Sequence, residues 1–318
     1  KGKIDLGKIL FFDKRLSADD TISCATCHDP EKGFADGRVI AVGIKERKGT
    51  RNSPTVLNAA FFDTQFWDGR VITLEEQAKQ PIINSKEMGM PSHDALVEKI
   101  SNISEYKTAF RAVFGTEKIT IDHIARAIAS FERTLISFNA PFDRFIAGEK
   151  DAISASAQRG WKLFQGKARC VTCHEFNRSY PFFTNNKFHN VGVAMKGKDF
   201  EFLARKAASS GADPSALVQE EASAELGRYL VTKEPKDIGA FKTSGLRNIA
   251  LTASFMHDGS ESTLESVVEF YNKGGVPNPN LDGGIRPLNL SEDEKKDSVV
   301  FMKSLTSDDL AGLGITIK

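Results

Sequence analysis

Every cysteine in this chain of 318 residues belongs to one of two Cys-x-x-Cys-His motifs. The motif residues are Cys24, Cys27 and His28 in the first copy and Cys170, Cys173 and His174 in the second. Each thiol can add to one vinyl group of a haem, and the adjacent histidine then meets the iron. Paired cysteines also begin zinc sites and thioredoxin-type redox centres. Zinc would need further Cys or His partners, and a redox pair gives no reason for a histidine to follow twice. The sequence therefore predicts two covalently bound haem c groups.

The two motifs lie in different halves of the chain, and a weak internal repeat precedes each. Gly7-Lys8-Ile9-Leu10-Phe11 stands before the first motif and Gly160-Trp161-Lys162-Leu163-Phe164 before the second. Each copy resembles the opening helix of a cytochrome c domain. A chain of this length also has a prior of about two domains. We predict a mainly α fold of two cytochrome c-like helical domains, residues 1–145 and 146–318, each with one covalent c-type haem.

Charge and hydrophobicity exclude several classes of partner. The chain has 43 basic and 42 acidic residues and a formal net charge of +1, so nothing favours a nucleic acid or a charged membrane surface. No apolar stretch approaches the roughly 20 residues that a bilayer-spanning helix needs. The chain begins without a hydrophobic signal core, so we expect any export signal to lie outside this sequence. Because bacteria attach haem to cysteines outside the cytoplasm, the motifs predict a periplasmic or otherwise exported protein.

Capping residues predict where helices begin and end. Ser104 is expected to cap a helix that stops before Gly115, and Thr120 to cap the next helix, which has apolar residues at helical spacing. We interpret residues 139–156 as the crossover between the domains. Residues 196–226 are predicted to be a polar insertion with one or two helices.

Six sequence blocks resemble the bacterial di-haem cytochrome c peroxidase and MauG superfamily. They follow the order of the family from the first residues to about residue 305, and several independent motifs in register are not expected by chance. The blocks are LGKILFF at 6–12, TRNSPT at 50–55, FWDGR at 66–70, Glu87-Met88, PFDR at 141–144 and LRNIALT at 246–252.

The resemblance implies that the first haem reacts with hydrogen peroxide. Trp67 matches a tryptophan between the two haems, where an indole can relay electrons. Gln77, Pro81 and Glu87 match residues around the open face of the first haem. A carboxylate there can take a proton from hydrogen peroxide and return it to the leaving oxygen. Taken alone, Trp67 would be interpreted as a core tryptophan and Glu87 as a solvated loop carboxylate.

A calcium ion is also implied by the resemblance. Asn52, Thr252 and Ser254 match a site between the domains, where amide and carbonyl oxygens suit a hard cation. The family usually has proline at the position of Ser254. His257 matches a histidine near a haem propionate rather than an iron ligand. We therefore expect one Ca²⁺ in addition to the two haems.

The loop before the Arg-Asn block departs from the peroxidase pattern. Peroxidases carry a histidine there that closes the first haem at rest and leaves on reductive activation. Ile44 stands at that position, and isoleucine cannot bind iron. We therefore predict that the first haem is ready for peroxide in the resting ferric state, without a preparatory electron.

The far side of the second haem is the other departure. Peroxidases place a methionine on the helix after a His-Asp-Gly segment, whereas counting along this chain places Tyr271 there, as MauG places a tyrosine. Tyr271 shares a helical face with apolar residues, so its phenol should point inward. The alternative is a packed core tyrosine, with Met256 or Met302 as the ligand. An anionic phenolate would stabilise ferric and higher iron and lower the haem potential.

This ligand set resembles MauG, which uses peroxide to withdraw electrons from tryptophans of another protein. One MauG feature is absent, because Ala168 replaces a surface tryptophan two residues before the second motif. Trp161 is a possible substitute, although a half-buried helix tryptophan is the simpler interpretation.

We predict a di-haem c-type peroxidase that reduces hydrogen peroxide with electrons from a protein partner. The partner is expected to be a small cytochrome, a copper protein or a tryptophan-bearing protein, and the enzyme a monomer or homodimer. The competing class is a non-enzymatic periplasmic electron-transfer cytochrome. Such a carrier would need strong ligands on both sides of both irons, and the isoleucine at position 44 counts against it.

Overall fold

The computed structural model describes residues 1–195 and 199–313. As predicted, the fold is mainly helical. The first half contains α1 (Gly2–Phe12), α2 (Cys24–Cys27), α3 (Leu74–Ile83), α4 (His93–Ser101), α5 (Ser104–Phe114) and α6 (Ile121–Glu132). The second half contains α7 (Pro141–Ala147), α8 (Ala155–Gln165), α9 (Phe200–Ser209), α10 (Pro214–Leu217), α11 (Glu221–Ala224), α12 (Tyr229–Thr232), α13 (Leu264–Asn272) and α14 (Glu292–Lys303). Strands β1 (Phe188–His189) and β2 (Phe241–Lys242) form an antiparallel pair.

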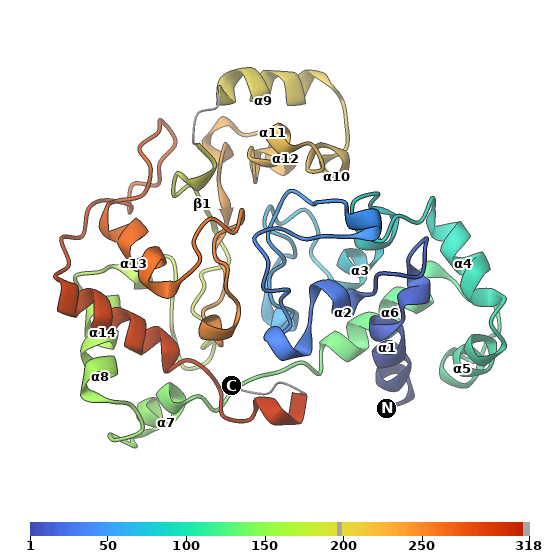
Figure 1. Ribbon diagram of the computed structural model, residues 1–318, viewed down its shortest axis with the longest axis horizontal. Coiled ribbons are helices and arrows are strands. Elements are labelled where there is room, and N and C mark those ends of the chain that lie inside the picture. The colour runs from blue at the N-terminus through green and yellow to red at the C-terminus, as the bar shows by residue number, and fades with distance from the viewer. Residues whose placement is uncertain (196–198, 314–318) are drawn as a thin grey trace.

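The helices gather into two groups that lie side by side, with a third group above them (Figure 1). Helices α1 to α6 form one group, and α7, α8, α13 and α14 form the other. Helices α9 to α12 lie over the boundary between these two groups.

The internal repeat marks two equivalent helix crossings. Helix α1 packs on α6 at Gly7, and helix α8 packs on α14 at Gly160. A side chain at Gly7 would overlap the carbonyl oxygen of Ala127, and one at Gly160 would overlap that of Asp297. Both positions therefore need glycine, because only a residue without a Cβ lets the two backbones approach so closely.

Each group of helices has its own apolar core. The first core is built mainly from residues 6–135, with Phe11, Phe110 and Ile124 among its fully buried side chains. The second is built from residues 142–305, with Phe142 and Phe301 fully buried. The boundary at residue 145 itself stays a prediction.

The insertion forms a third apolar cluster. It contains α9, α10 and α11 within residues 199–226, so the expectation of one or two helices was wrong by one. Residues 196–198 of the predicted insertion lie outside the described residues. Phe200, Leu217 and Leu230 are buried in this cluster, and Trp67 from the first half packs against it. The insertion therefore joins the two halves.

Two local predictions needed correction. Helix α5 begins at Ser104 itself, and Ile103 is its N-cap residue. Residues 139–156 are not only a crossover, because they contain α7, which begins at a proline. Proline is favoured in a first helical turn, where its missing N–H leaves no helical bond unmade. The predicted ends at Thr120 and Gly115 are confirmed, since Thr120 accepts a hydrogen bond from the N–H of His123 and Gly115 is left-handed with φ 72°.

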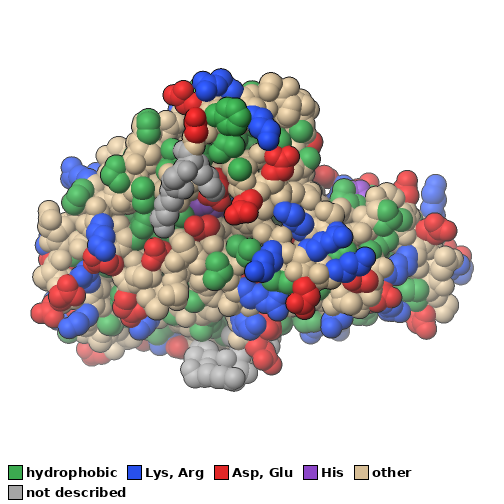
Figure 2. Space-filling model, turned by 45° about the horizontal axis from the view of Figure 1, so that its top comes forward, with side chains coloured by type: hydrophobic (Ala, Val, Ile, Leu, Met, Phe, Trp, Pro, Cys, Tyr) green, Lys and Arg blue, Asp and Glu red, His purple; other side chains and the backbone are tan. Residues whose placement is uncertain are grey.

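Across residues 1–195 and 199–313, we find no helix with the length and apolar character needed to cross a bilayer. Figure 2 shows basic and acidic side chains interspersed over one face of the molecule. This mixture agrees with the nearly balanced charge of the sequence.

Candidate functional site: two cavities joined by a tryptophan

A first cavity brings together the residues predicted for the first haem. It contains ≈ 1320 Å³ of space free of protein atoms, part of which is open to solvent. Seven predicted residues line it: Cys24, Cys27, His28, Trp67, Gln77, Pro81 and Glu87. They come from the first motif, a loop, helix α3 and the loop that follows α3.

The first motif has the geometry that haem attachment requires. Helix α2 places Cys24 and Cys27 three residues apart on one face. Both thiols are free, and burial raises the pKa of Cys27 to about 12. Nδ1 of His28 lies 3.3 Å from the carbonyl oxygen of Phe34, and burial lowers the pKa of this histidine. Neutral imidazole that donates from one nitrogen presents the other to a metal, so these residues fit a covalent haem.

Glu87 supplies a carboxyl group to the same cavity. Asn84 donates a hydrogen bond from Nδ2 to Oε1 of Glu87 at 2.7 Å. Burial raises the pKa of Glu87, and Arg70 and this hydrogen bond oppose the rise. A carboxyl group with a raised pKa exchanges protons closer to neutral pH than a free one.

Ile44 packs behind the Glu87 loop rather than in the cavity. Its N–H donates to the carbonyl oxygen of Glu87 at 2.8 Å, and its side chain is 4% exposed. A side chain at Gly89 would overlap the Ile44 side chain. Of the described residues, those lining the first cavity do not include Ile44. The loop therefore supports Glu87 without sending its isoleucine into the cavity.

A second cavity, of ≈ 1570 Å³ and also partly open to solvent, contains the second motif. Cys170, Cys173 and His174 line it, and both thiols are free. Nδ1 of His174 lies 2.9 Å from the carbonyl oxygen of Phe183. Burial lowers the pKa of His174 to about 4. This motif therefore repeats the geometry of the first and fits a second haem.

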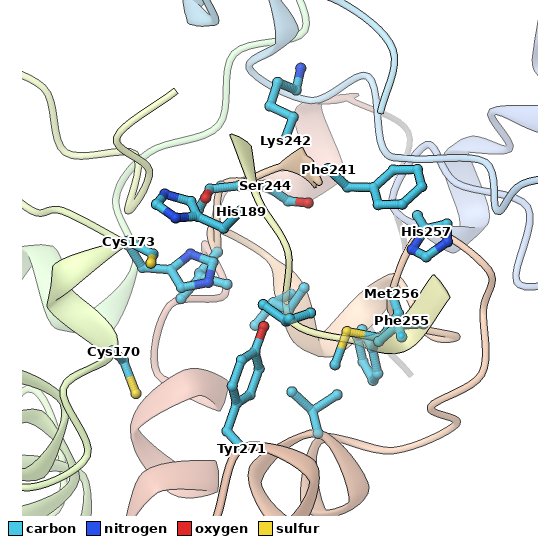
Figure 3. A pocket seen from close by; sticks show the side chains of 18 of the residues that line it. Cys170, Cys173, His189, Phe241, Lys242, Ser244, Phe255, Met256, His257 and Tyr271 are labelled. Atoms are coloured by element: carbon cyan, nitrogen blue, oxygen red, sulfur yellow. The ribbon is translucent and has the colours of Figure 1, made fainter. Parts of the chain in front are cut away.

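All three candidates for the far-side ligand reach the second cavity: Tyr271, Met256 and Met302. Tyr271 lies in the last turn of α13. Figure 3 shows its hydroxyl pointing into the cavity, with Cys170 and Cys173 on one side and Met256 on the other. Burial raises the pKa of Tyr271, and the nearby cysteines add to the rise. The inward direction of the phenol agrees with the helical pattern, and the choice of ligand stays a prediction.

Trp67 lines both cavities. Its Nε1 donates to the carbonyl oxygen of Asn52 at 2.9 Å, and the N–H of Asn52 donates to the carbonyl oxygen of His257 at 2.8 Å. The rings of Trp67 and His257 lie 6.5 Å apart between centroids. A short path of ring and backbone contacts therefore connects the two cavities.

His257 is buried at the edge of the second cavity. Its ring stacks on Phe241 with centroids 3.6 Å apart, and its Nε2 lies 3.0 Å from Oε2 of Glu225, a residue of the insertion. Glu225 was not predicted as a site residue, because nothing in its local sequence places it beside a histidine 32 positions away.

The residues predicted for calcium also meet at the second cavity: Asn52, Thr252 and Ser254. Asn52 Nδ2 and Ser254 Oγ both donate to the carbonyl oxygen of Arg38, at 2.8 and 3.0 Å. Thr252 Oγ1 instead donates to the carbonyl oxygen of Ile249 at 3.3 Å. Among the described residues, no group of three or more His, Cys, Asp or Glu side chains could hold a metal ion. A calcium site here would therefore rest on amide and carbonyl oxygens.

A buried ion cluster supports the wall of the first cavity. Asp68 is fully buried and accepts hydrogen bonds from Arg51 at 2.8 Å and from Arg70 at 3.0 Å. Burial acts to raise the pKa of Asp68, but the two guanidinium groups outweigh it and lower the pKa. Sequence analysis missed this cluster, although the blocks TRNSPT and FWDGR contain all three residues.

The insertion from the second half closes part of the first cavity. Val218 and Gln219 line that cavity. Thr50 Oγ1 donates to the carbonyl oxygen of Val218 at 2.7 Å, and Lys86 Nζ donates to that of Gln219 at 2.6 Å. The loop that carries Glu87 is therefore held from the other half of the chain, which no local sequence signal indicated.

Trp161 is packed among aromatic rings. Phe142, Phe176 and Phe301 lie 5.0 to 5.6 Å from it between centroids, and it does not line either of the two described cavities. Ala168 is buried at 6% exposure. The ring contacts support the interpretation of Trp161 as a half-buried helix tryptophan that packs against the second core.

Comparisons with known proteins agree with this arrangement. The family model for di-haem cytochrome c peroxidase matches residues 1–151. The chain is 40% identical to methylamine utilization protein MauG of Methylorubrum extorquens over 97% of this chain and 79% of that protein. It is 36% identical to cytochrome c551 peroxidase of Nitrosomonas europaea over 96% of this chain and 80% of that protein.

A solved structure shares the fold along almost the whole chain. It is that of a MauG-like protein associated with microbial copper homeostasis, with a TM-score of 0.80 and 31% identity over 98% of this chain and 91% of that one. The sequence left two classes open, a di-haem peroxidase and a non-enzymatic electron carrier. The relatives, together with two cavities that each hold a Cys-x-x-Cys-His motif, favour the peroxidase. The chain therefore belongs to the di-haem cytochrome c peroxidase and MauG family, and it is a peroxidase-type oxidoreductase rather than a non-enzymatic electron carrier.

Proposed function

We propose that this protein reduces hydrogen peroxide in the first cavity and oxidises a partner protein through the second. The observation that carries this proposal is that Trp67 lines both cavities, while the carboxyl group of Glu87 faces the first. In the reaction, hydrogen peroxide takes two electrons and two protons and becomes two molecules of water. The electrons come from the partner protein.

In the first cavity, Cys24, Cys27 and His28 would hold one haem c. A haem iron held there supplies the coordination position for peroxide and the route by which electrons reach it. Glu87 takes a proton from one peroxide oxygen and returns it to the other, which leaves as water. Gln77 and Pro81 line the same cavity on α3 and limit the space beside Glu87.

The second haem would be held by Cys170, Cys173, His174 and Tyr271, with His257 near a propionate. Trp67 relays electrons between the cavities, because its indole is the large aromatic ring that borders both. Phenolate ligation by Tyr271 would lower the potential of the second haem and favour its taking part in oxidation.

The remaining expectations belong to the same proposal. One Ca²⁺ would bind near Asn52, Thr252 and Ser254 and stiffen the boundary between the domains 1–145 and 146–318. Haem attachment would take place after export, which places the protein in the periplasm. A hydrogen-bond frame already holds Asn52 and Ser254 against one carbonyl oxygen.

The partner is proposed to be a small cytochrome, a copper protein or a tryptophan-bearing protein. One relative is named methylamine utilization protein MauG and another is named cytochrome c551 peroxidase. Ile44 and Tyr271 favour the MauG-like ligand set over that of the standard peroxidases.

Two measurements test this function. Electron paramagnetic resonance of the oxidised protein should show one high-spin and one low-spin haem. Trp67→Phe should keep both haems and abolish the peroxide-driven oxidation of a reduced cytochrome, whereas the control Trp161→Phe should not. Two low-spin haems and no peroxide consumption in the wild-type protein would refute the proposal.

A further inference from the structure

Glu132, the last residue of α6, is a buried carboxyl group that the proposed mechanism does not use. It lies one helical turn after Ile128, and both side chains line the first cavity. Its residue exposure is 4%. Within the described part of the chain, its Oε2 is buried without a hydrogen-bond partner.

The charges around Glu132 do not neutralise it. The cation that acts on the charge of Glu132 is Arg133, and its Nη1 and Nη2 donate to the carboxylate of Glu75 on α3 at 2.7 and 2.8 Å. Glu75 itself and the thiol of Cys24 are the other titratable groups that face Glu132. A carboxylate without a cation or a hydrogen bond is costly to bury, so Glu132 keeps its proton at neutral pH. In agreement, burial raises the pKa of Glu132 to about 8.

Peroxide reduction creates a need for such a proton. Glu87 only moves a proton from one oxygen of peroxide to the other, so the two protons that complete two waters must enter the cavity. Electrons that arrive from a partner protein bring no protons with them. Among the described residues, Glu87 and Glu132 are the carboxyl groups that line the first cavity.

We propose that Glu132 is a proton-supplying residue of the first cavity. Its O–H bond breaks as a new O–H bond forms on the peroxide-derived oxygen, directly or through a cavity water, and water is released. The carboxylate then regains a proton from solvent, beside the surface pair of Glu75 and Arg133. This role rests on the proposed peroxide reduction.

The position of Glu132 suits transfer between inside and outside. Its carboxyl group faces the cavity, while the next residue, Arg133, is 45% exposed in its side chain and bonded to Glu75. Leu74 and Gln77, from the same turn of α3 as Glu75, line the cavity. The wall between the cavity and solvent is therefore thin at this point.

Three variants of the haem-loaded protein test the proposal. Glu132→Gln preserves the shape of the side chain and removes the proton, Glu132→Asp keeps the acid and shortens the side chain, and Glu201→Gln, on the exposed helix α9, is a surface control. The infrared C=O band of a protonated carboxylic acid at pH 7 should be lost in Glu132→Gln and retained in the other two. This band reports the protonation of Glu132 without any turnover.

Peroxide reduction should slow by about 10²-fold in Glu132→Gln, the loss expected when a positioned acid is removed. The wild-type rate should fall as the pH rises through the pKa of Glu132, because the acid must be protonated to donate, and Glu132→Gln should lack this fall. Glu132→Asp should restore much of the rate. If Glu132 only filled space, Glu132→Gln should be faster than Glu132→Asp, because glutamine matches the shape of glutamate better than aspartate does.

The outcomes separate this proposal from the proposed function. An unchanged infrared band in Glu132→Gln, or a normal rate and pH profile in that variant, overturns the role of Glu132 and leaves peroxide reduction intact. A wild-type protein that does not consume peroxide overturns both.

Discussion

Replacing Glu87 with glutamine is the sharpest test of the first cavity. Glutamine has the same shape and keeps an oxygen that can accept the 2.7 Å hydrogen bond from Asn84. The carbonyl oxygen of residue 87 still accepts from the N–H of Ile44 at 2.8 Å. The loop should therefore keep its conformation, and both haems should remain attached. The variant loses only the ability to exchange a proton.

The expected loss of rate follows from that single change. A positioned acid–base group contributes about 10²- to 10⁴-fold, which corresponds to about 3–5 kcal/mol of activation free energy. A general base must be ionised to act, so the wild-type rate should fall as the pH drops through the pKa of Glu87. Because burial raises that pKa, the fall should occur closer to neutral pH than for a free glutamate, and Glu87→Gln should lack it.

The assay is stopped-flow mixing of the fully oxidised protein with hydrogen peroxide, followed by haem absorbance. Glu46→Gln is a matched control, since Glu46 belongs to the supporting loop and its side chain is exposed. Thermal unfolding of both variants checks that the fold is intact. An unchanged rate in Glu87→Gln, with normal haem content, would refute the assignment.

Four further outcomes are expected. Because Ile44 stays out of the first cavity, the oxidised protein should react with peroxide without added reductant; a lag that only prior reduction removes would contradict this. Tyr271→Met should raise the potential of one haem in a redox titration, and an unaltered haem spectrum in Tyr271→Phe would exclude phenolate ligation. Asp68→Asn leaves two buried guanidinium groups without their carboxylate and should cost about 3–5 kcal/mol in denaturant unfolding, against almost nothing for the exposed Glu201→Gln. The pKa of Glu132 rises from 4.5 in the unfolded chain to about 8 in the folded protein. Between these values only the unfolded chain loses this proton, so the free energy of unfolding should fall as the pH rises from 4.5 to 8, by at most about 5 kcal/mol, and Glu132→Gln should not show that fall.

Local signals predicted the parts of the site that depend on neighbouring residues. The motif spacing places Cys24 and Cys27 on one turn, and capping chemistry fixes the start of α6 at Thr120. The helical pattern also directs Tyr271 inward, since one face of α13 is apolar. These features rest on the short-range geometry of helices.

Other parts depend on contacts that close only in three dimensions. The wall formed by Val218 and Gln219 needs the insertion to fold back on the first half. Glu132 Oε2 has no hydrogen-bond partner, and the neighbouring Arg133 forms its ion pair with Glu75 instead. A signal for Glu132 did exist, because it follows Ile128 by one turn on the core-facing side of α6.

The origin of the Val218–Gln219 wall bears on how the protein matures. These residues leave the ribosome long after Cys24 and Cys27, because they lie almost 200 positions later in the chain. The first haem can therefore be attached while its cavity still lacks one wall and while Lys86 has no carbonyl partner on the insertion. Reactivity toward peroxide is accordingly a property of the completed chain. A truncated protein that lacked the insertion would hold its first haem beside an open Glu87 loop that has no support from Val218 and Gln219.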